Sequence, residues 1–108
     1  MSNAEQAAHT TVLLHEAVDA LVTDIDGFYV DGTFGRGGHV AELLGRLSGQ
    51  GSVLAIDKDP QAISAGQERF AEDARLQLFH GSFADLQNVA AEMGKTGDIS
   101  GVLLDLGV

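Results

Sequence analysis

The residues best placed to do chemistry form a glycine-rich segment, Asp31-Gly32-Thr33-Phe34-Gly35-Arg36-Gly37-Gly38-His39. It joins an expected strand over residues 28–31 to an expected helix over residues 39–47. Glycines let a chain turn sharply and let a ligand approach the backbone closely. The free N–H groups of a helix start favour a carboxylate or a phosphate. The segment is thus a candidate ligand loop, although an ordinary strand–helix turn can look the same.

A second candidate is Asp57, which closes an apolar strand expected over residues 53–57. An acid roughly twenty residues after such a loop accepts hydrogen bonds from the hydroxyls of an adenosine ribose. Asp57 could instead cap the next helix, but Asp59, directly before Pro60, is better placed for that role. Loop and acid together predict a site for an adenosine-containing cofactor.

The details of the loop favour S-adenosylmethionine over NAD. The dinucleotide fingerprint G-x-G-x-x-G needs a third glycine, whereas here Gly35 and Gly37 are followed by Val40. Asp31 would repel a pyrophosphate but would suit the ammonium group of S-adenosylmethionine. An NAD-linked dehydrogenase and a nucleotide-binding module without catalytic activity remain open alternatives.

Strands and helices alternate along the chain, which predicts an α/β domain with a parallel sheet. Helices are expected over residues 12–22, 39–47, 60 to about 72, and 84–93. Strands are expected over residues 28–31, 53–57, 76–80 and 99–105. The helix over 39–47 has its apolar residues at helical spacing: Val40, Leu43, Leu44 and Leu47.

From His9 to Val108 the chain resembles the bacterial methyltransferases that modify N4 of a cytosine in small-subunit (16S) ribosomal RNA. The resemblance rests on five stretches: residues 9–16 (HTTVLLHE), 31–39 (DGTFGRGGH), 57–60 (DKDP), 80–83 (HGSF) and 104–108 (LDLGV). It implies a Rossmann-like class I methyltransferase fold with strand order 3-2-1-4 and flanking helices. It also implies an enzyme that uses S-adenosyl-L-methionine, with ribosomal RNA as its partner. A methyltransferase with another substrate is the main rival.

The resemblance also assigns residues. It places Gly37, Gly38 and His39 against the cofactor, with Asp31 and Gly35 in the same loop. It places Asp57 on the ribose, Phe83 beside the adenine and Asp105 near the methyl group. Many amino-methyltransferases have Asn/Asp-Pro-Pro-Tyr after the fourth strand, but here Asp105-Leu106-Gly107 stands there. Asp105 is therefore the candidate acceptor for the N4 hydrogens of the cytosine.

The resemblance predicts that residues 9–108 are only the front half of a cofactor-binding domain, cut off after its fourth strand. Residues 1–8 are expected to be a tail. We expect the 108 residues alone to lack RNA methylation activity. The fourth strand would then be an open apolar edge, Val102-Leu103-Leu104, able to pair in a two-fold homodimer.

The charge, the lack of cysteine and the lack of a long apolar run limit which partners and locations are expected for this chain. The formal net charge is −10 with only six Lys and Arg, so the RNA should be gripped mainly outside this segment. The lack of cysteine excludes disulfides and thiolate chemistry, and no metal is expected. No apolar run is long enough for a membrane span and no signal peptide is recognisable, so we expect a cytoplasmic protein without membrane contact.

Overall fold

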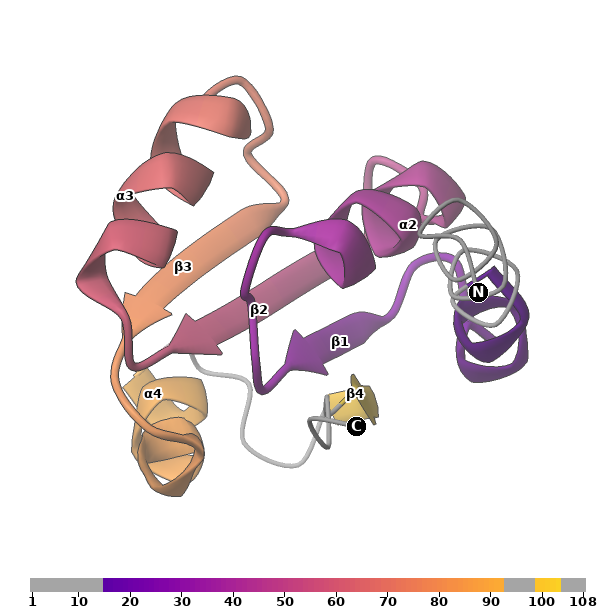
Figure 1. Ribbon diagram of the computed structural model, residues 1–108. Coiled ribbons are helices and arrows are strands. Elements are labelled where there is room, and N and C mark those ends of the chain that lie inside the picture. Colours follow the sequence, from indigo (N-terminus) through magenta and orange to yellow (C-terminus); the bar gives the residue numbers. More distant parts are fainter. Residues whose placement is uncertain (1–14, 93–98, 104–108) are drawn as a thin grey trace, which may run out of the picture.

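A four-stranded parallel sheet forms the centre of the computed structural model, which describes residues 15–92 and 99–103 (Figure 1). The strands are β1 (Phe28–Asp31), β2 (Ser52–Asp57), β3 (Leu76–His80) and β4 (Ile99–Leu103). Their order is β3-β2-β1-β4, and every neighbouring pair is parallel. This confirms the sheet order 3-2-1-4 and the Rossmann-like α/β architecture expected from the sequence.

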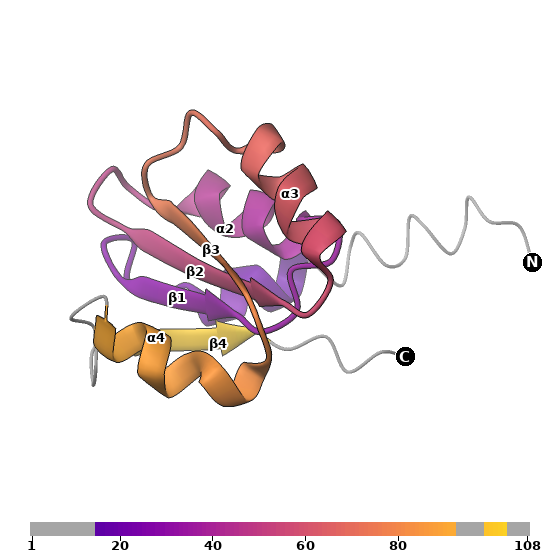
Figure 2. The same ribbon diagram turned by 90° about the vertical axis from the view of Figure 1, so that its left-hand side faces the viewer.

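Helices lie on both faces of the sheet (Figure 2). Helices α2 (Gly38–Arg46) and α3 (Pro60–Arg69) cover one face. The short 3₁₀ turn η1 (Phe83–Asp85) leads into α4 (Leu86–Glu92), which covers the other face. A further helix, over residues 15–21, packs beside α2 through Val18.

Two predicted helices differ from the structure by more than one residue at an end. The helix expected to reach about residue 72 ends at Arg69, because Phe70 turns out of helical geometry and residues 70–72 and 74–75 form turns. The helix expected over residues 84–93 is preceded by η1, because the carboxylate of Asp85 accepts the N–H of Ser82 and tightens the first turn.

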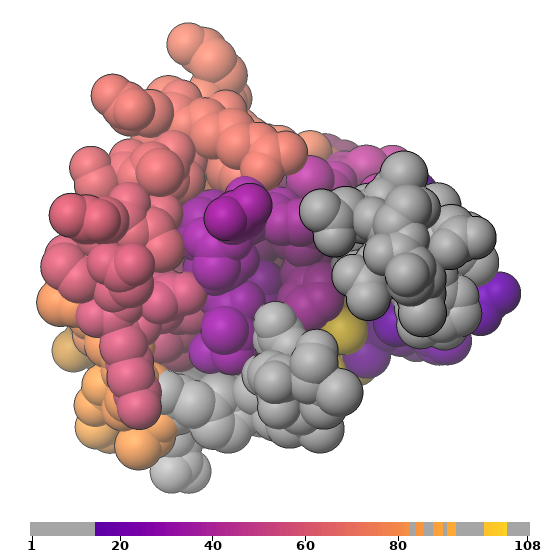
Figure 3. Space-filling model, viewed as in Figure 1, coloured from indigo at the N-terminus to yellow at the C-terminus, as the bar shows by residue number. Residues whose placement is uncertain are grey.

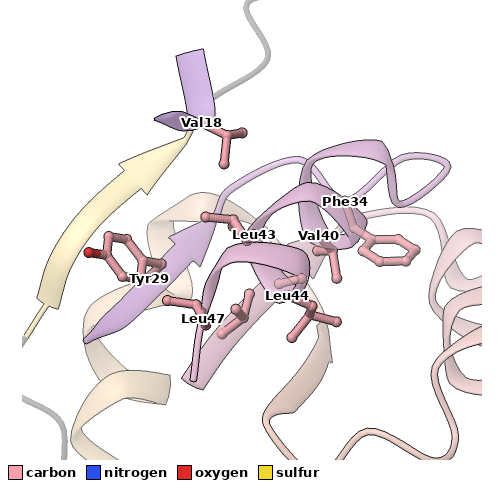
Figure 4. Close-up of a cluster of buried hydrophobic side chains, with 9 residues drawn as sticks. Val18, Tyr29, Phe34, Val40, Leu43, Leu44 and Leu47 are labelled. Atoms are coloured by element: carbon pink, nitrogen blue, oxygen red, sulfur yellow. The ribbon is translucent and has the colours of Figure 1, made fainter. Parts of the chain in front are cut away.

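Alternate residues of the strands fill two apolar layers. Tyr29, Val53 and Ala55 face α2 and α3, in a cluster that includes every apolar residue predicted for the α2 stripe (Figure 4). Val30, Leu54 and Ile56 face the other way, toward α4. The interior of β2 is buried on both faces, as a central strand between two helix layers must be. This two-sided burial fixes where the ends of β1 and β2 lie.

Strand β4 pairs with β1 through a bulge. Phe28 is opposite Ile99, whereas Tyr29 is opposite Gly101, so Ser100 is the extra residue. Its hydroxyl oxygen accepts the N–H of Phe28 at 3.1 Å, which ties the bulge to β1. Gly101 then lets Leu21 pack closely on β4, since a Cβ there would lie 2.7 Å from Leu21 Cδ1.

The amino ends of the strands are held by ion pairs. Arg75 pairs with Asp73 at 2.6 Å and donates to the carbonyl oxygens of Leu44 and Leu47 at the end of α2, at 2.9 and 3.0 Å. Arg46 pairs with Glu42 at 2.6 Å and with Asp19, on the helix over 15–21, at 2.5 Å. None of the helices within 15–92 is long and apolar enough to span a bilayer.

Candidate functional site

The loop over residues 32–37 leaves the carboxyl end of β1 and is tied to both neighbouring strands. The N–H of Gly32 donates to the carbonyl of Leu103 at the end of β4, at 2.8 Å. The N–H of Phe34 donates to the carbonyl of Ile56 in β2, at 2.9 Å. In the space-filling view this region (purple) is exposed beside α3 (Figure 3). The candidate ligand loop therefore lies at the carboxyl edge of the sheet, where α/β folds bind ligands.

Two glycines of the loop adopt left-handed backbone conformations, but their surroundings differ. Gly35 has φ +56°, and a Cβ added there would meet nothing within 4 Å. Gly37 has φ +85° and caps α2, and its Cβ would lie 3.1 Å from both Phe34 and Phe70. Gly35 therefore opens the backbone toward space, whereas Gly37 serves a tight turn against other side chains.

Phe34 anchors the loop to α3. Its side chain is 3% exposed and meets Phe70 edge-to-face, with the ring centroids 6.2 Å apart. It fits only because α3 has Gly66 there, since a Cβ on Gly66 would lie 2.6 Å from the Phe34 ring. Arg69 adds a hydrogen bond to the carbonyl of Arg36, at 2.8 Å. Sequence reasoning missed this anchor, although an aromatic residue inside a glycine loop was the available signal.

Asp57 binds the loop directly. Its Oδ2 accepts the N–H of Gly35 at 2.7 Å, and its Oδ1 accepts the N–H of Asp59 at 2.8 Å. A carboxylate has about four acceptor positions, so one remains on each oxygen. Asp59, as predicted, caps α3 by accepting the N–H of Gln61 at 2.9 Å. Asp57 is thus free of the helix cap and can accept two further donors while it holds the loop.

Asp31 is the one buried charged residue in the described part of the chain, with an exposure of 0%. Its Oδ1 accepts the N–H of Thr33 at 3.0 Å and lies 3.7 Å from Nδ1 of His39. Among residues 15–92 and 99–103, nothing hydrogen-bonds to its Oδ2. Burial raises the pKa of Asp31, while nearby His39 and the hydrogen bond from the N–H of Thr33 lower it and the charge of Asp57 raises it further.

The end of β3 completes the described part of the site. The N–H of Gly81 donates to the carbonyl of Asp57 at 2.9 Å, so the turn after β3 starts beside the Asp57 turn. The backbone of Phe83, two residues after Gly81, begins η1. Asp105 lies outside the described residues. The structure therefore brings Asp31, Gly35 and Asp57 together at one edge, while the side chain of Phe83, like Asp105, lies outside what the structure describes.

The arrangement suits a ligand that carries hydroxyl donors and a positive charge. Hydroxyls can reach the open acceptor positions of Asp57 beside the uncovered Gly35, and the unsatisfied Oδ2 of buried Asp31 favours a positive charge at this edge of the sheet. Within the described ranges, no three metal-binding side chains gather. An open hollow of about 240 Å³ lies elsewhere, between the end of α3 and the start of β3, and contains none of these residues.

Comparison with known proteins identifies the family of this chain. The model of the MraW methylase family matches residues 6–108. The chain belongs to this family. Its similarity to curated members is high: it is 57% identical to ribosomal RNA small subunit methyltransferase H of Shewanella amazonensis over 101 residues, covering 94% of this chain and 32% of the relative.

The same-named protein of Legionella pneumophila is 50% identical over 102 residues, covering 94% of this chain and 33% of the relative. This MraW-family chain therefore spans about a third of the length of its curated relatives. A solved geranyl diphosphate methyltransferase, in complex with SAM, matches with a TM-score of 0.59 at 20% identity, over 67% of this chain and 30% of the other. At that identity the likeness shows a shared fold.

Proposed function

We propose that this chain is the cofactor-binding part of an S-adenosylmethionine-dependent methyltransferase that modifies N4 of a cytosine in small-subunit ribosomal RNA in the cytoplasm. Family membership and the names of the relatives support the activity. The relatives are about three times as long as this chain, so the whole protein would carry the activity.

The observation that carries the cofactor proposal is the Asp57 carboxylate, which holds Gly35 and keeps one acceptor position open on each oxygen. The two hydroxyls of a ribose would take these positions. The unsatisfied Oδ2 of Asp31 would take the ammonium of the methionine part. A pyrophosphate beside the Asp31 charge would be repelled, which argues against NAD.

The remaining loop residues have supporting roles in this proposal. Gly37 and Gly38 form the start of α2, whose N–H groups would face the methionine carboxylate. His39, near Asp31, would contact the same end of the cofactor. Phe83, at the turn after β3, would lie beside the adenine. These four assignments rest on the resemblance and on the position of their backbones at the carboxyl edge.

When bound, S-adenosylmethionine supplies an electrophilic methyl group on its sulfonium. The cytosine N4 is a weak nucleophile, because its lone pair is delocalised into the ring. We propose that Asp105, two residues beyond the described end of β4, accepts a hydrogen bond from the N4 amine and so helps to free that lone pair. Most of the rate would come from holding the two reactants in line, and no metal is needed.

Two assays test this function. Titration calorimetry on the full-length protein should show binding of S-adenosylhomocysteine and none of NADH; the reverse would reject the cofactor. Full-length protein should then incorporate labelled methyl groups at a cytosine of small-subunit RNA or subunits, whereas the 108-residue chain should not. Methylation of a small molecule instead would favour a methyltransferase with another substrate.

We also propose that the 108-residue chain, when isolated, forms a two-fold dimer through β4. This strand is the outer strand of the described sheet, with Ile99 37% and Val102 38% exposed. An uncovered apolar strand edge is a template for pairing with a second chain. Light scattering in high salt, where acidic repulsion is screened, should report twice the monomer mass; a monodisperse monomer would reject the dimer.

A further inference from the structure

His80 is the last residue of β3, and its exposed side chain reaches across to the neighbouring strand end. Its ring Nε2 lies 2.8 Å from the carbonyl oxygen of Lys58. A carbonyl oxygen can only accept, so Nε2 must carry the hydrogen and donate it. His80 is thus a directed hydrogen-bond donor to one peptide group in the turn that follows β2.

That peptide group lies in the turn that carries Asp57. Lys58 stands between Asp57, which holds Gly35, and Asp59, which caps α3. The carbonyl of Asp57, one residue before Lys58, accepts a hydrogen bond from the N–H of Gly81 at 2.9 Å. The side chain of His80 and the backbone of Gly81 therefore hold two successive carbonyls of this turn.

We propose that His80 is a positioning residue for the adenosine half of the cofactor. By holding the Lys58 carbonyl, it fixes the direction of the Asp57 carboxylate relative to the turn that begins at Gly81. This sets the spacing between the ribose acceptor after β2 and the adenine side after β3. The inference rests on the proposed cofactor, and His80 itself touches no reacting atom.

Three substitutions separate this role from a general structural one. His80→Ala removes the donor. His80→Gln places an amide N–H near the position of Nε2, whereas the shorter His80→Asn places it near Nδ1, out of reach of the Lys58 carbonyl. His15→Ala is the matched control, because His15 is also exposed but pairs with Glu42 at 2.9 Å, away from the site.

The experiment is titration calorimetry of the full-length variants with S-adenosylhomocysteine and with methylthioadenosine, which lacks the amino acid part. His80→Ala and His80→Asn should weaken both ligands by the same factor, about three- to tenfold, the worth of one hydrogen bond. His80→Gln should restore affinity to within about twofold. In turnover assays the KM for S-adenosylmethionine should rise while kcat stays unchanged.

Other outcomes overturn the inference. Unchanged affinity in His80→Ala, or no rescue by Gln over Asn, would show that the bond does not position the site. A loss for S-adenosylhomocysteine alone would place the effect at the methionine half. An equal loss in His15→Ala would show a general effect of stability. Failure of wild-type protein to bind either ligand would reject the proposed function instead.

Discussion

The two ends of the sheet treat their charged groups in opposite ways. At the amino ends, Arg75 donates both to Asp73 and to the last carbonyls of α2, and its hydrogen bonds to the Asp73 carboxylate lower the pKa of Asp73. At the carboxyl ends, Asp31 is buried with one oxygen unsatisfied by any described residue, and burial raises its pKa. The charges at the amino ends hold neighbouring elements together, whereas the carboxyl ends have hydrogen-bond acceptors that no described residue satisfies.

Charged residues occur at both ends of the sheet, but they stabilise the fold at the amino ends and are available for a ligand at the carboxyl ends. Ion pairs that satisfy each other stabilise the domain but leave little for a ligand. An unsatisfied buried carboxylate costs stability, and such costs are concentrated at functional sites. Substitutions at the amino ends should therefore change stability with little effect on ligand affinity, whereas substitutions of the acceptors at the carboxyl ends should change affinity.

The largest expected effect is on the ligand acceptor. Asp57→Ala should weaken S-adenosylhomocysteine binding about ten- to a hundredfold, because two charge-assisted hydrogen bonds to the ribose are lost and Gly35 is released. Asp59→Ala is the control, since it removes only the α3 cap and should cost about 1 kcal/mol of stability with little change in affinity. Titration calorimetry measures the affinities of both variants, and scanning calorimetry measures their stabilities. Equal affinities for the two variants would remove Asp57 from the site.

At the opposite end, Arg75→Ala should lower the free energy of unfolding by about 1–3 kcal/mol. It leaves two carbonyls at the end of α2 without their donor and breaks the pair with Asp73. Affinity for S-adenosylhomocysteine should stay within about twofold, because no ligand group lies there. Urea unfolding measures the stability; a large loss of affinity in folded protein would contradict the separation of the two ends.

The two left-handed glycines give a finer comparison. Gly37→Ala should cost more stability than Gly35→Ala, since each carries a backbone penalty of about 1 kcal/mol but only Gly37 is crowded by Phe34 and Phe70. Gly35→Ala should instead have the larger effect on ligand affinity, because its Cβ occupies space that the protein leaves open. Equal ligand affinities would mean that no ligand approaches Gly35.

Asp31→Asn should raise stability and lower affinity together. The raised pKa of Asp31 means that its charged form is disfavoured by folding, so removal of the charge should gain on the order of 1 kcal/mol at neutral pH. The gain should disappear as the pH falls through the raised pKa toward the usual value of 3.8, because wild-type Asp31 is then protonated in both states. Urea unfolding from pH 7 to 3 would show a constant difference if Asp31 were not the cause.

Much of the fold followed from the sequence, because its apolar periods are regular. The strand over residues 28–31 and the third strand over 76–80 have the predicted bounds, and Asp59 caps α3 as its place before Pro60 indicated. The sheet order came from the family resemblance, since strand periodicity alone does not say which strands are neighbours. The positions of the glycine loop and of Asp57 at the strand ends also followed from the sequence, because backbone freedom and an acid after an apolar run are local features.

Long-range contacts were not predictable in this way. The fit of Phe34 against Gly66 joins residues from different elements, and nothing local marks Gly66 as its partner. The second role of Asp57, as acceptor for the loop N–H of Gly35, requires the folded geometry of two strand ends. The Ser100 bulge likewise depends on pairing with β1. These features follow from tertiary packing, which overrides local propensity.

The central claim is that the ligand binds at the carboxyl edge beside Asp31, Gly35 and Asp57. Backbone amide shifts of the ¹⁵N-labelled full-length protein, titrated with S-adenosylhomocysteine, test it most directly. The account predicts the largest shifts at Gly35, Gly38 and the turn after β2, with none from NADH. Shifts concentrated instead at the hollow between α3 and β3, around Gln67 and Gln77, would contradict it.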